Sequence, residues 1–351
     1  MKIVFVIQTL AKGGAERVVS LLSKEFSKQG FEVIILLFDK KVSYEYGGEI
    51  LELDLKASSN IFKKGINFIK RVKRVREVFL EQKPDFIFSF VESCNFVSIL
   101  SGFDVVVSIR NNPLKKHQLW QRVLIFILYR FKNVKKIVTV SKELEEILKK
   151  RFLLSNVKTI SNPTVFKDSI NKDSMIDKFK PFILSVGRLH EQKNFKLLIK
   201  AYNDTRLKEF AKLLIIGDGK EKKELLRLID DLSLNNRVYL LGEKDSLDIY
   251  YANAKLFTLS SLYEGFPNVL IEALSFCLPV ISTNCPTGPS EIIVDEFNGL
   301  LVKNGDQKEL SFALDRLYFD KNLQDKFKKN AKNSIKHLEI NTIARRWIEC
   351  Y

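Results

Sequence analysis

The sequence predicts an α/β protein made of two domains, each with a parallel sheet packed between helices. Short apolar runs typical of buried parallel strands alternate along the chain with segments of helical periodicity. Glycines stand where strands pass into helices, as at Gly13-Gly14 and at Gly217. The length of 351 residues suits two domains of ordinary size.

The composition narrows the class of protein. No apolar run is long enough to cross a bilayer, so no membrane-spanning helix is expected. The apolar run at residues 3–7 is too short for a signal peptide, and we interpret it as a buried strand. The four cysteines, Cys94, Cys277, Cys285 and Cys350, lack paired spacing. They indicate reduced thiols in a cytosolic protein, without a disulfide framework or a metal site.

The first half of the chain opens with a βαβ unit. Strands are expected over residues 3–10, 31–38, 85–90, 104–109, 136–141 and 157–160, and helices over residues 15–29 and 61–80. Gly30 ends the first helix, and Ser141 caps the helix after residue 141. The glycine turn at residues 12–16 gives backbone N–H groups room to approach a phosphate. It matches neither G-x-G-x-x-G nor a Walker loop, so a tight turn without a ligand stays an alternative.

The second half repeats the alternation after a polar stretch at residues 167–180. Strands are expected over residues 181–187, 213–216, 238–242, 256–260 and 279–283, and helices over residues 246–254, 306–334 (two helices) and 339–350. We therefore predict a domain over residues 1–165, a domain over residues 178–335, and a segment over residues 336–351 that packs back towards the first domain.

The positive charge is concentrated in the first half. Of the net +16, residues 1–163 carry 29 Lys+Arg against 16 Asp+Glu, whereas the remainder carries 29 against 26. This indicates an anionic partner, either nucleic acid or an anionic membrane, and no nucleic-acid module is recognisable. Residues 61–80 form a basic amphipathic helix, and residues 114–136 mix aromatic with basic side chains. The cations predicted to face the membrane are Lys63, Lys64, Lys70, Arg71, Lys73 and Arg74; the alternative is a solvated helix face.

Two carboxylates bracket the stretch from Ser261 to Leu274. Gly265 and Pro267 place a helix start near Asn268, so Glu264 stands ahead of the helix and Glu272 lies about one turn inside it. The unpaired N–H groups of such a helix start suit an anion such as a diphosphate.

Two cations follow a strand of the second half. Arg188 and Lys193 stand five residues apart around a turn, an arrangement that can neutralise a leaving nucleoside diphosphate without a metal. In a chain with 58 basic residues, two unrelated surface cations are the alternative.

Together these motifs resemble the signatures of the retaining nucleotide-sugar glycosyltransferases of family 4. The resemblance rests on Gly187-Arg188-Leu189, on Gln192-Lys193-Asn194 and on the paired glutamates, and it runs from Gly13-Gly14 to the C-terminal helix. It implies the GT-B fold, in which two Rossmann-like domains face each other across a cleft and a C-terminal helix crosses back to the first domain. It also implies that Glu264 sits by the donor sugar and that Glu272 binds the ribose. The diphosphate would be held by Arg188, Lys193 and Gly187 and by the N–H groups of Asn268, Val269 and Leu270, with Gly14 closing on the donor.

The chain departs from the family at one loop. Many relatives carry a histidine after the fourth strand, where this sequence has Arg110 and Asn111, which we expect to orient the donor sugar or the acceptor. His117 is near enough in sequence to stay a candidate. The loop resembles that of bacterial polysaccharide transferases, which often move N-acetylhexosamines.

The sequence therefore predicts a retaining glycosyltransferase that moves an N-acetylhexosamine from a UDP-sugar to a polyprenyl-diphosphate-linked glycan, in assembly of O-antigen, capsule or protein glycan. Its catalytic residues would be Glu264, Arg188 and Lys193, it would need no metal or cofactor, and it would work on the inner face of the plasma membrane. The alternatives are a nucleotide-sugar epimerase, a phosphorylase, a non-catalytic nucleotide-sugar or lipid-binding subunit, and a dehydrogenase, although G-x-G-x-x-G is missing.

Overall fold

A computed structural model describes residues 1–11, 13–53, 61–166 and 174–351, without the side chains of residues 61–64, 115–116 and 174–175. The chain divides into two compact units. The first consists of Met1–Pro163 together with Leu338–Tyr351, and the second of Thr164–His337. Sequence reasoning placed the domains at residues 1–165 and 178–335. No described helix is both long and apolar enough to span a bilayer.

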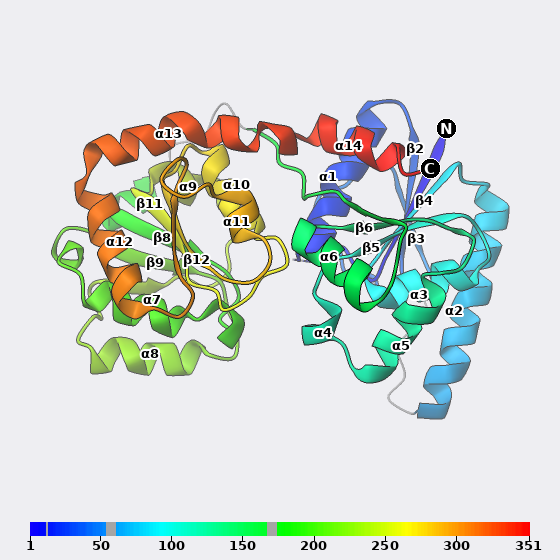
Figure 1. Ribbon diagram of the computed structural model, residues 1–351, viewed down its shortest axis with the longest axis horizontal. Coiled ribbons are helices and arrows are strands. Elements are labelled where there is room, and N and C mark those ends of the chain that lie inside the picture. Colours follow the sequence, from blue (N-terminus) through cyan, green and yellow to red (C-terminus); the bar gives the residue numbers. More distant parts are fainter. Residues whose placement is uncertain (12, 54–60, 167–173) are drawn as a thin grey trace. The chain divides into compact units, whose positions relative to one another are not determined.

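The first unit is built on a seven-stranded parallel sheet (Figure 1). Its elements are β1 (Lys2–Ile7), α1 (Gly14–Lys28), β2 (Glu32–Leu37), β3 (Glu49–Glu52), α2 (Ile61–Gln82), β4 (Phe86–Phe90), α3 (Glu92–Leu100), β5 (Val105–Ile109), α4 (Pro113–Lys116), α5 (Leu119–Leu128), β6 (Val134–Thr139), α6 (Lys142–Arg151), β7 (Val157–Thr159) and α14 (Ile340–Ile348). The strand order is β3-β2-β1-β4-β5-β6-β7. The order reverses direction between β1 and β4, where open α/β sheets bind their ligands.

The C-terminal helix belongs to the first unit. Helix α14 packs against α1, and Trp347 is buried between the rings of Phe88 and Phe90, at centroid distances of 5.2 and 5.1 Å. The hydroxyl of Tyr351, just beyond the helix, donates to the Ile87 carbonyl at 2.9 Å. The predicted return of the chain to its first domain is thus confirmed.

The second unit contains a six-stranded parallel sheet with strand order β10-β9-β8-β11-β12-β13. Its elements are β8 (Phe182–Val186), α7 (Phe195–Asn203), β9 (Lys212–Ile216), α8 (Lys222–Asp231), β10 (Val238–Leu240), α9 (Asp248–Asn253), β11 (Leu256–Leu259), α10 (Asn268–Ser275), β12 (Val280–Asn284), α11 (Pro289–Ile292), β13 (Leu300–Lys303), α12 (Gln307–Phe319) and α13 (Lys321–Ile335), with 3₁₀ turns at Ser174–Phe179, Glu191–Lys193 and Leu207–Glu209 and a further one, Lys336–Leu338, where the chain returns to the first unit. The order reverses between β8 and β11, so the loops after these two strands meet at one edge.

Helix α2 confirms the predicted amphipathic helix but changes which side chains are exposed. Val75 and Phe79 are buried, whereas Lys70, Lys73 and Arg74 are exposed. Arg71 does not share that exposed face, because it is half-buried with its guanidinium 5.1 Å from the centre of the Phe38 ring. The side chains of Lys63 and Lys64 lie outside the described residues.

Candidate active site

The loop after β8 is fixed by the loop after β9. The Gly187 N–H donates to the Ile216 carbonyl and the Leu189 N–H to the Asp218 carbonyl, both at 2.9 Å. Gly217 has φ +142°, and a Cβ there would lie 2.0 Å from the Gly187 carbonyl oxygen, so only glycine fits. This frame presents Arg188 as an exposed side chain at the carboxyl end of β8.

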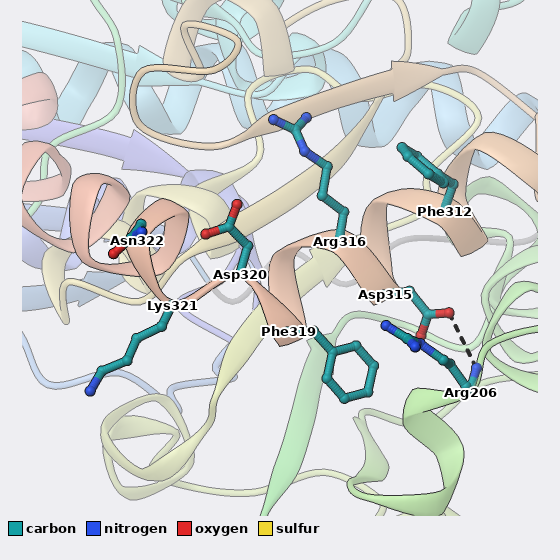
Figure 2. A pocket seen from close by; sticks show the side chains of 8 residues that line it. All are labelled: Arg206, Phe312, Asp315, Arg316, Phe319, Asp320, Lys321 and Asn322. Carbon is teal, nitrogen blue, oxygen red and sulfur yellow. Dashed lines mark hydrogen bonds between the residues drawn. The ribbon is translucent and has the colours of Figure 1, made fainter.

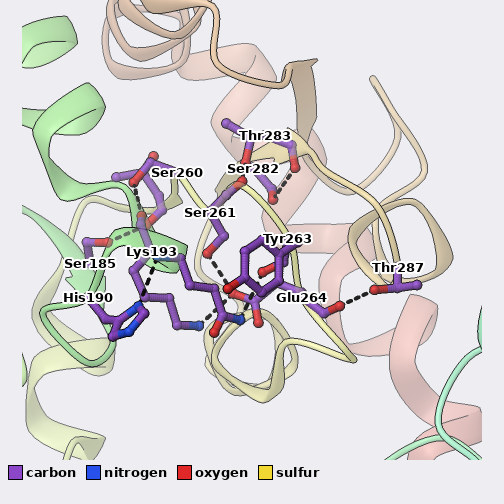
Figure 3. A network of polar contacts seen from close by, with 12 residues as sticks. Ser185, His190, Lys193, Ser260, Ser261, Tyr263, Glu264, Ser282, Thr283 and Thr287 are labelled. Carbon is purple, nitrogen blue, oxygen red and sulfur yellow. Dashed lines mark hydrogen bonds and ion pairs between the residues drawn. The ribbon is translucent and has the colours of Figure 1, made fainter. Parts of the chain in front are cut away.

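The predicted Lys193 and Glu264 meet at the point where the strand order reverses (Figure 3). Lys193 Nζ lies 2.6 Å from Glu264 Oε1, and the two side chains are only 16% and 7% exposed. The hydroxyl of Ser261 donates to the same carboxylate oxygen at 2.6 Å. A Cβ at Gly187 would lie 3.1–3.2 Å from the Lys193 methylenes, so this glycine makes room for the lysine stem.

Backbone contacts join the loops that carry this pair. The Leu262 N–H donates to the Gln192 carbonyl at 2.8 Å, and Gln192 Nε2 donates to the Tyr263 carbonyl at 2.9 Å. The Ser260 hydroxyl donates to the Lys193 carbonyl at 2.9 Å. The positions of the ammonium and the carboxylate are therefore set by two loops that hold each other.

The loop after β12 supports Glu264 from a third side. The Glu264 N–H donates to the Pro286 carbonyl at 3.2 Å, and the Thr287 hydroxyl donates to the Glu264 carbonyl. Thr287 is buried and has φ +63°, which is unusual for a β-branched residue. Such strain persists only where the surroundings enforce it, and it is frequent at functional sites. Sequence reasoning missed Thr287; its position between Pro286 and Gly288 was the available signal.

Cys285 in the same loop is not a nucleophile at neutral pH. Burial, with the nearby Glu264 carboxylate adding to the effect, raises the pKa of the Cys285 thiol to about 12. The thiol stays protonated and behaves as a small apolar side chain.

The second glutamate lies in a different environment. Helix α10 begins at Asn268, as predicted, and Glu272 is buried within it. The Tyr251 hydroxyl donates to Glu272 Oε2 at 2.9 Å, and the Tyr251 ring stacks on Phe276. Tyr251 was not singled out from the sequence. The Leu270 N–H, expected to face a diphosphate together with those of Asn268 and Val269, instead donates to the Pro267 carbonyl at 3.0 Å.

The first unit holds Arg110 in place at the carboxyl end of β5. Its guanidinium donates to Asn162 Oδ1 and lies 6.0 Å from the centre of the Phe90 ring. Burial lowers the pKa of the Arg110 guanidinium to about 9, with the Glu16 carboxylate opposing the shift, so the side chain is a cation at neutral pH. The neighbouring Asn111 is half-buried.

The remaining candidates of the first unit are placed as follows. Gly14 is exposed as the first residue of α1, and a Cβ on the preceding Gly13 would lie 2.2 Å from Glu16 Oε2. His117 is buried, with Nε2 3.1 Å from Glu92 Oε1. Its imidazole therefore lies inside the unit, next to the Glu92 carboxylate.

A surface pocket of about 720 Å³ lies elsewhere, on the helical side of the second unit (Figure 2). It is lined by Arg206, Phe312, Asp315, Arg316, Phe319, Asp320, Lys321 and Asn322. None of these residues was predicted for the site, and they come from α12, α13 and the segment after α7 rather than from a strand's carboxyl end. Within the described part of the chain, no three His, Cys, Asp or Glu side chains gather as metal ligands would.

Solved structures of glycosyltransferases share this fold. HepE of Anabaena, solved with UDP-glucose, aligns with a TM-score of 0.81 at 20% identity over 99% of this chain and 98% of its own. A glycosyltransferase of Rickettsia africae aligns with a TM-score of 0.81 at 19% identity over 99% and 97%. Two parallel-sheet, Rossmann-like domains with these neighbours show the GT-B fold.

Comparison of the sequence with models of protein families shows the family of this chain. Residues 12–164 match the family described as Glycosyltransferase Family 4, and residues 166–334 match Glycosyl transferases group 1. The chain belongs to glycosyltransferase family 4.

Two relatives from Campylobacter jejuni are similar over nearly their full length. One, 30% identical over 99% of this chain and 98% of its own, is named a GalNAc-alpha-(1->4)-GalNAc-alpha-(1->3)-diNAcBac-PP-undecaprenol alpha-1,4-N-acetyl-D-galactosaminyltransferase. The other, 32% identical over 97% and 96%, is named an N-acetylgalactosamine-N,N'-diacetylbacillosaminyl-diphospho-undecaprenol 4-alpha-N-acetylgalactosaminyltransferase.

Proposed function

We propose that the protein transfers an N-acetylhexosamine from a UDP-sugar to a polyprenyl-diphosphate-linked glycan, with retention of anomeric configuration. The observation that carries the proposal is the contact among Lys193, Glu264 and Ser261 where the strand order of the second sheet reverses. The names of the two Campylobacter relatives support the class of donor sugar and of acceptor. The product would enter O-antigen, capsule or protein-glycan assembly.

In this proposal the two glutamates have different roles. Glu264 faces the donor sugar, and the Lys193 ammonium offsets its charge in a site that is largely shielded from water. Glu272 receives the ribose hydroxyls with its carboxylate, which Tyr251 orients. Of the first unit's residues, Gly14 binds the donor, and Arg110 and Asn111 orient the donor sugar or the acceptor.

Departure of the nucleotide is the step that needs cations. The bond between the anomeric carbon and the diphosphate oxygen breaks, the acceptor oxygen bonds to that carbon, and the acceptor proton passes to the leaving phosphate. Arg188 is exposed at the carboxyl end of β8, where a guanidinium can bind two phosphate oxygens, and Lys193 adds a point charge. The Gly187 backbone and the start of α10 at Asn268 and Val269 complete the diphosphate seat.

The role of Glu264 is tested by substitution. Glu264→Ala should abolish sugar transfer while leaving UDP binding within a few-fold of the unchanged protein, because the nucleotide is held by other groups. Transfer is read by mass spectrometry on a panel of UDP-sugars with lipid-linked acceptors, and UDP binding by calorimetry. The control is Glu309→Ala, an exposed glutamate of α12. Undiminished transfer by Glu264→Ala would overturn the assignment.

Metal independence is tested separately. We expect transfer to survive EDTA, because the diphosphate charge is met by Arg188 and Lys193. Complete loss in EDTA with recovery on adding Mn²⁺ or Mg²⁺ would refute this part of the proposal and leave the transfer reaction standing.

A further inference from the structure

Helix α5 leaves most of its apolar side chains in solvent. Of its ten residues only Ile125 and Leu128 are buried. Five other apolar residues of the helix, and one just beyond it, are between 42% and 76% exposed: Leu119, Trp120, Val123, Phe126, Ile127 and Phe131. Scattered exposed apolar residues are ordinary, but a contiguous set on one short helix marks a binding surface.

The charged side chains of the chain segment that contains α5 are all cationic. The sequence contains no acidic residue between Asp104 and Glu143. Arg122 is held beside the start of α5, donating to the Leu114 and His117 carbonyls at 2.5 and 3.0 Å. Arg130 follows the end of α5, with its guanidinium 3.8 Å from the centre of the Phe126 ring. Both cations therefore lie along the apolar surface without a carboxylate from this segment.

Exposed apolar side chains beside basic ones also occur around α3 and on α2. A shallow groove of about 500 Å³ lies between the end of α3 and the residues after α5, and it is lined by Ile99, Leu100, Gly102, Arg130, Phe131, Lys132 and Asn133. Helix α2 exposes Ile66 and Ile69 beside Lys70 and Lys73. Helices α2 and α5 both pack on α3 (Figure 1). Apolar and cationic side chains thus recur across these helices.

We propose that α5 inserts its apolar side chains into the interfacial region of an anionic bilayer, with Arg122 and Arg130 at the level of the lipid phosphates. The inference deepens the proposed function, because an acceptor carried on a polyprenyl chain is embedded in such a bilayer. An amphipathic helix with aromatic and aliphatic side chains on one side and cations beside them lies in the plane of the membrane interface.

A second copy of this chain fits the surface less well. Ten helical residues span about 15 Å, which offers less area than the ~800 Å² per partner of a stable dimer. In a two-fold symmetric contact the same surface meets itself, so Arg122 and Arg130 of one copy would approach the cations of the other.

The two tryptophans make the test direct, because Trp347 is buried and Trp120 is exposed. Vesicles of phosphatidylcholine and phosphatidylglycerol should shift the Trp120 emission to the blue, and lipids brominated near the top of the acyl chain should quench it. Trp120→Phe should remove the shift while the protein still binds. Binding to these vesicles with unchanged Trp120 emission would overturn the proposal.

A paired substitution tests the energetics. Trp120→Ser with Phe126→Ser should weaken vesicle binding by at least about tenfold, since two large apolar groups lose their burial. The matched control, Phe210→Ser with Phe312→Ser, removes exposed aromatic residues of the second unit and should bind as before. If the Trp120/Phe126 variant binds vesicles normally but loses self-association in analytical ultracentrifugation, the surface is a contact between copies and the proposal fails.

Transfer to a short-chain, water-soluble acceptor separates this inference from the proposed function. The Trp120/Phe126 variant should retain that transfer while losing transfer to the vesicle-borne acceptor. Absence of vesicle insertion by the unchanged protein, with its transfer to the soluble acceptor intact, would refute the role of α5 alone. Absence of transfer by the unchanged protein on both acceptors, with insertion intact, would refute the proposed function alone.

Discussion

At the scale of single residues, Glu264 is held through both its side chain and its backbone. Its carboxylate contacts Lys193 and Ser261, and its backbone contacts Pro286 and Thr287. In the proposed reaction Glu264 faces the positive charge that develops on the donor sugar. Such a group gains from being held before the substrate arrives, because no reorganisation is then needed during the reaction. The strained backbone of Thr287 is consistent with that requirement.

Thr287→Val keeps the shape of the side chain but removes the hydroxyl that donates to the Glu264 carbonyl. We expect kcat to fall by about tenfold, equivalent to about 1.4 kcal/mol, with KM for the UDP-sugar little changed. Thr287→Ser should restore most of kcat because it keeps the donor. A rise in KM at constant kcat in Thr287→Val would assign the residue to donor binding instead.

Tyr251→Phe removes the hydroxyl that donates to Glu272 and keeps the ring that stacks on Phe276. We expect the KM for the UDP-sugar to rise by roughly 3- to 10-fold with kcat unchanged. The lost hydrogen bond orients the Glu272 carboxylate, which in the proposed reaction binds the ribose equally in the ground state and the transition state. Steady-state kinetics at varied donor concentration measure this. An equal fall of kcat and kcat/KM would contradict the ribose role of Glu272.

Sequence reasoning found some of these residues and not others, for a physical reason. Glu264, Glu272, Arg188 and Lys193 stand at recognisable spacings next to strand and helix boundaries. Thr287 and Tyr251 reach the two glutamates from 23 and 21 residues away. Their contacts exist only once β11, β12 and α9 are assembled, and no local pattern encodes them.

At the scale of elements, the same contrast holds. Strands buried on both faces, such as β1 and β8, were predictable because a short continuous apolar run is typical of a strand in a parallel sheet covered on both faces. Strand β3 (Glu49–Glu52) was missed because it lies at the edge of the sheet, is short and is not fully buried. Helix α3 was missed because most of it is buried, which removes the polar face that periodicity detects.

The loops after β8 and β9 behave as one element, and Gly217 is where their backbones meet. Gly217→Ala should destabilise the protein by about 1–3 kcal/mol, because a Cβ would meet the Gly187 carbonyl in a backbone conformation that favours glycine. Urea unfolding measures the change. Gly242→Ala, also at positive φ but with open space around its Cβ, is the matched control and should cost less.

The exposed lysines of α2 should add electrostatic attraction to the membrane binding proposed for α5. Reversing Lys70 and Lys73 to Glu should weaken binding to anionic vesicles by at least about tenfold, since each basic residue near such a surface contributes about 1 kcal/mol. The effect should shrink as salt is raised. Lys326→Glu with Lys329→Glu, exposed on α13, alters the net charge equally and should leave binding nearly unchanged. Equal losses in both variants would indicate a general charge effect.

At the scale of the whole molecule, the chain crosses from the second unit back into the first before it ends. The sequence favoured that return because its last predicted helix carries Trp347, and α14 packs on α1 and β4. The first unit therefore cannot complete its core until residues 338–351 have been made. Its stability depends on a segment far from it in sequence, whereas the core of the second unit lies within one continuous stretch.

Trp347→Ala tests that dependence. Removing a buried tryptophan between Phe88 and Phe90 should cost the first unit about 3–5 kcal/mol through lost burial and the cavity left behind. Hydrogen exchange read peptide by peptide should show faster exchange in β1 and β4, with protection of β8 and β11 unchanged, because the buried residues of α14 belong to the core of the first unit. Equal loss of protection in both sheets would mean that the two units unfold cooperatively. No loss in β4 would mean that α14 does not stabilise the sheet of the first unit.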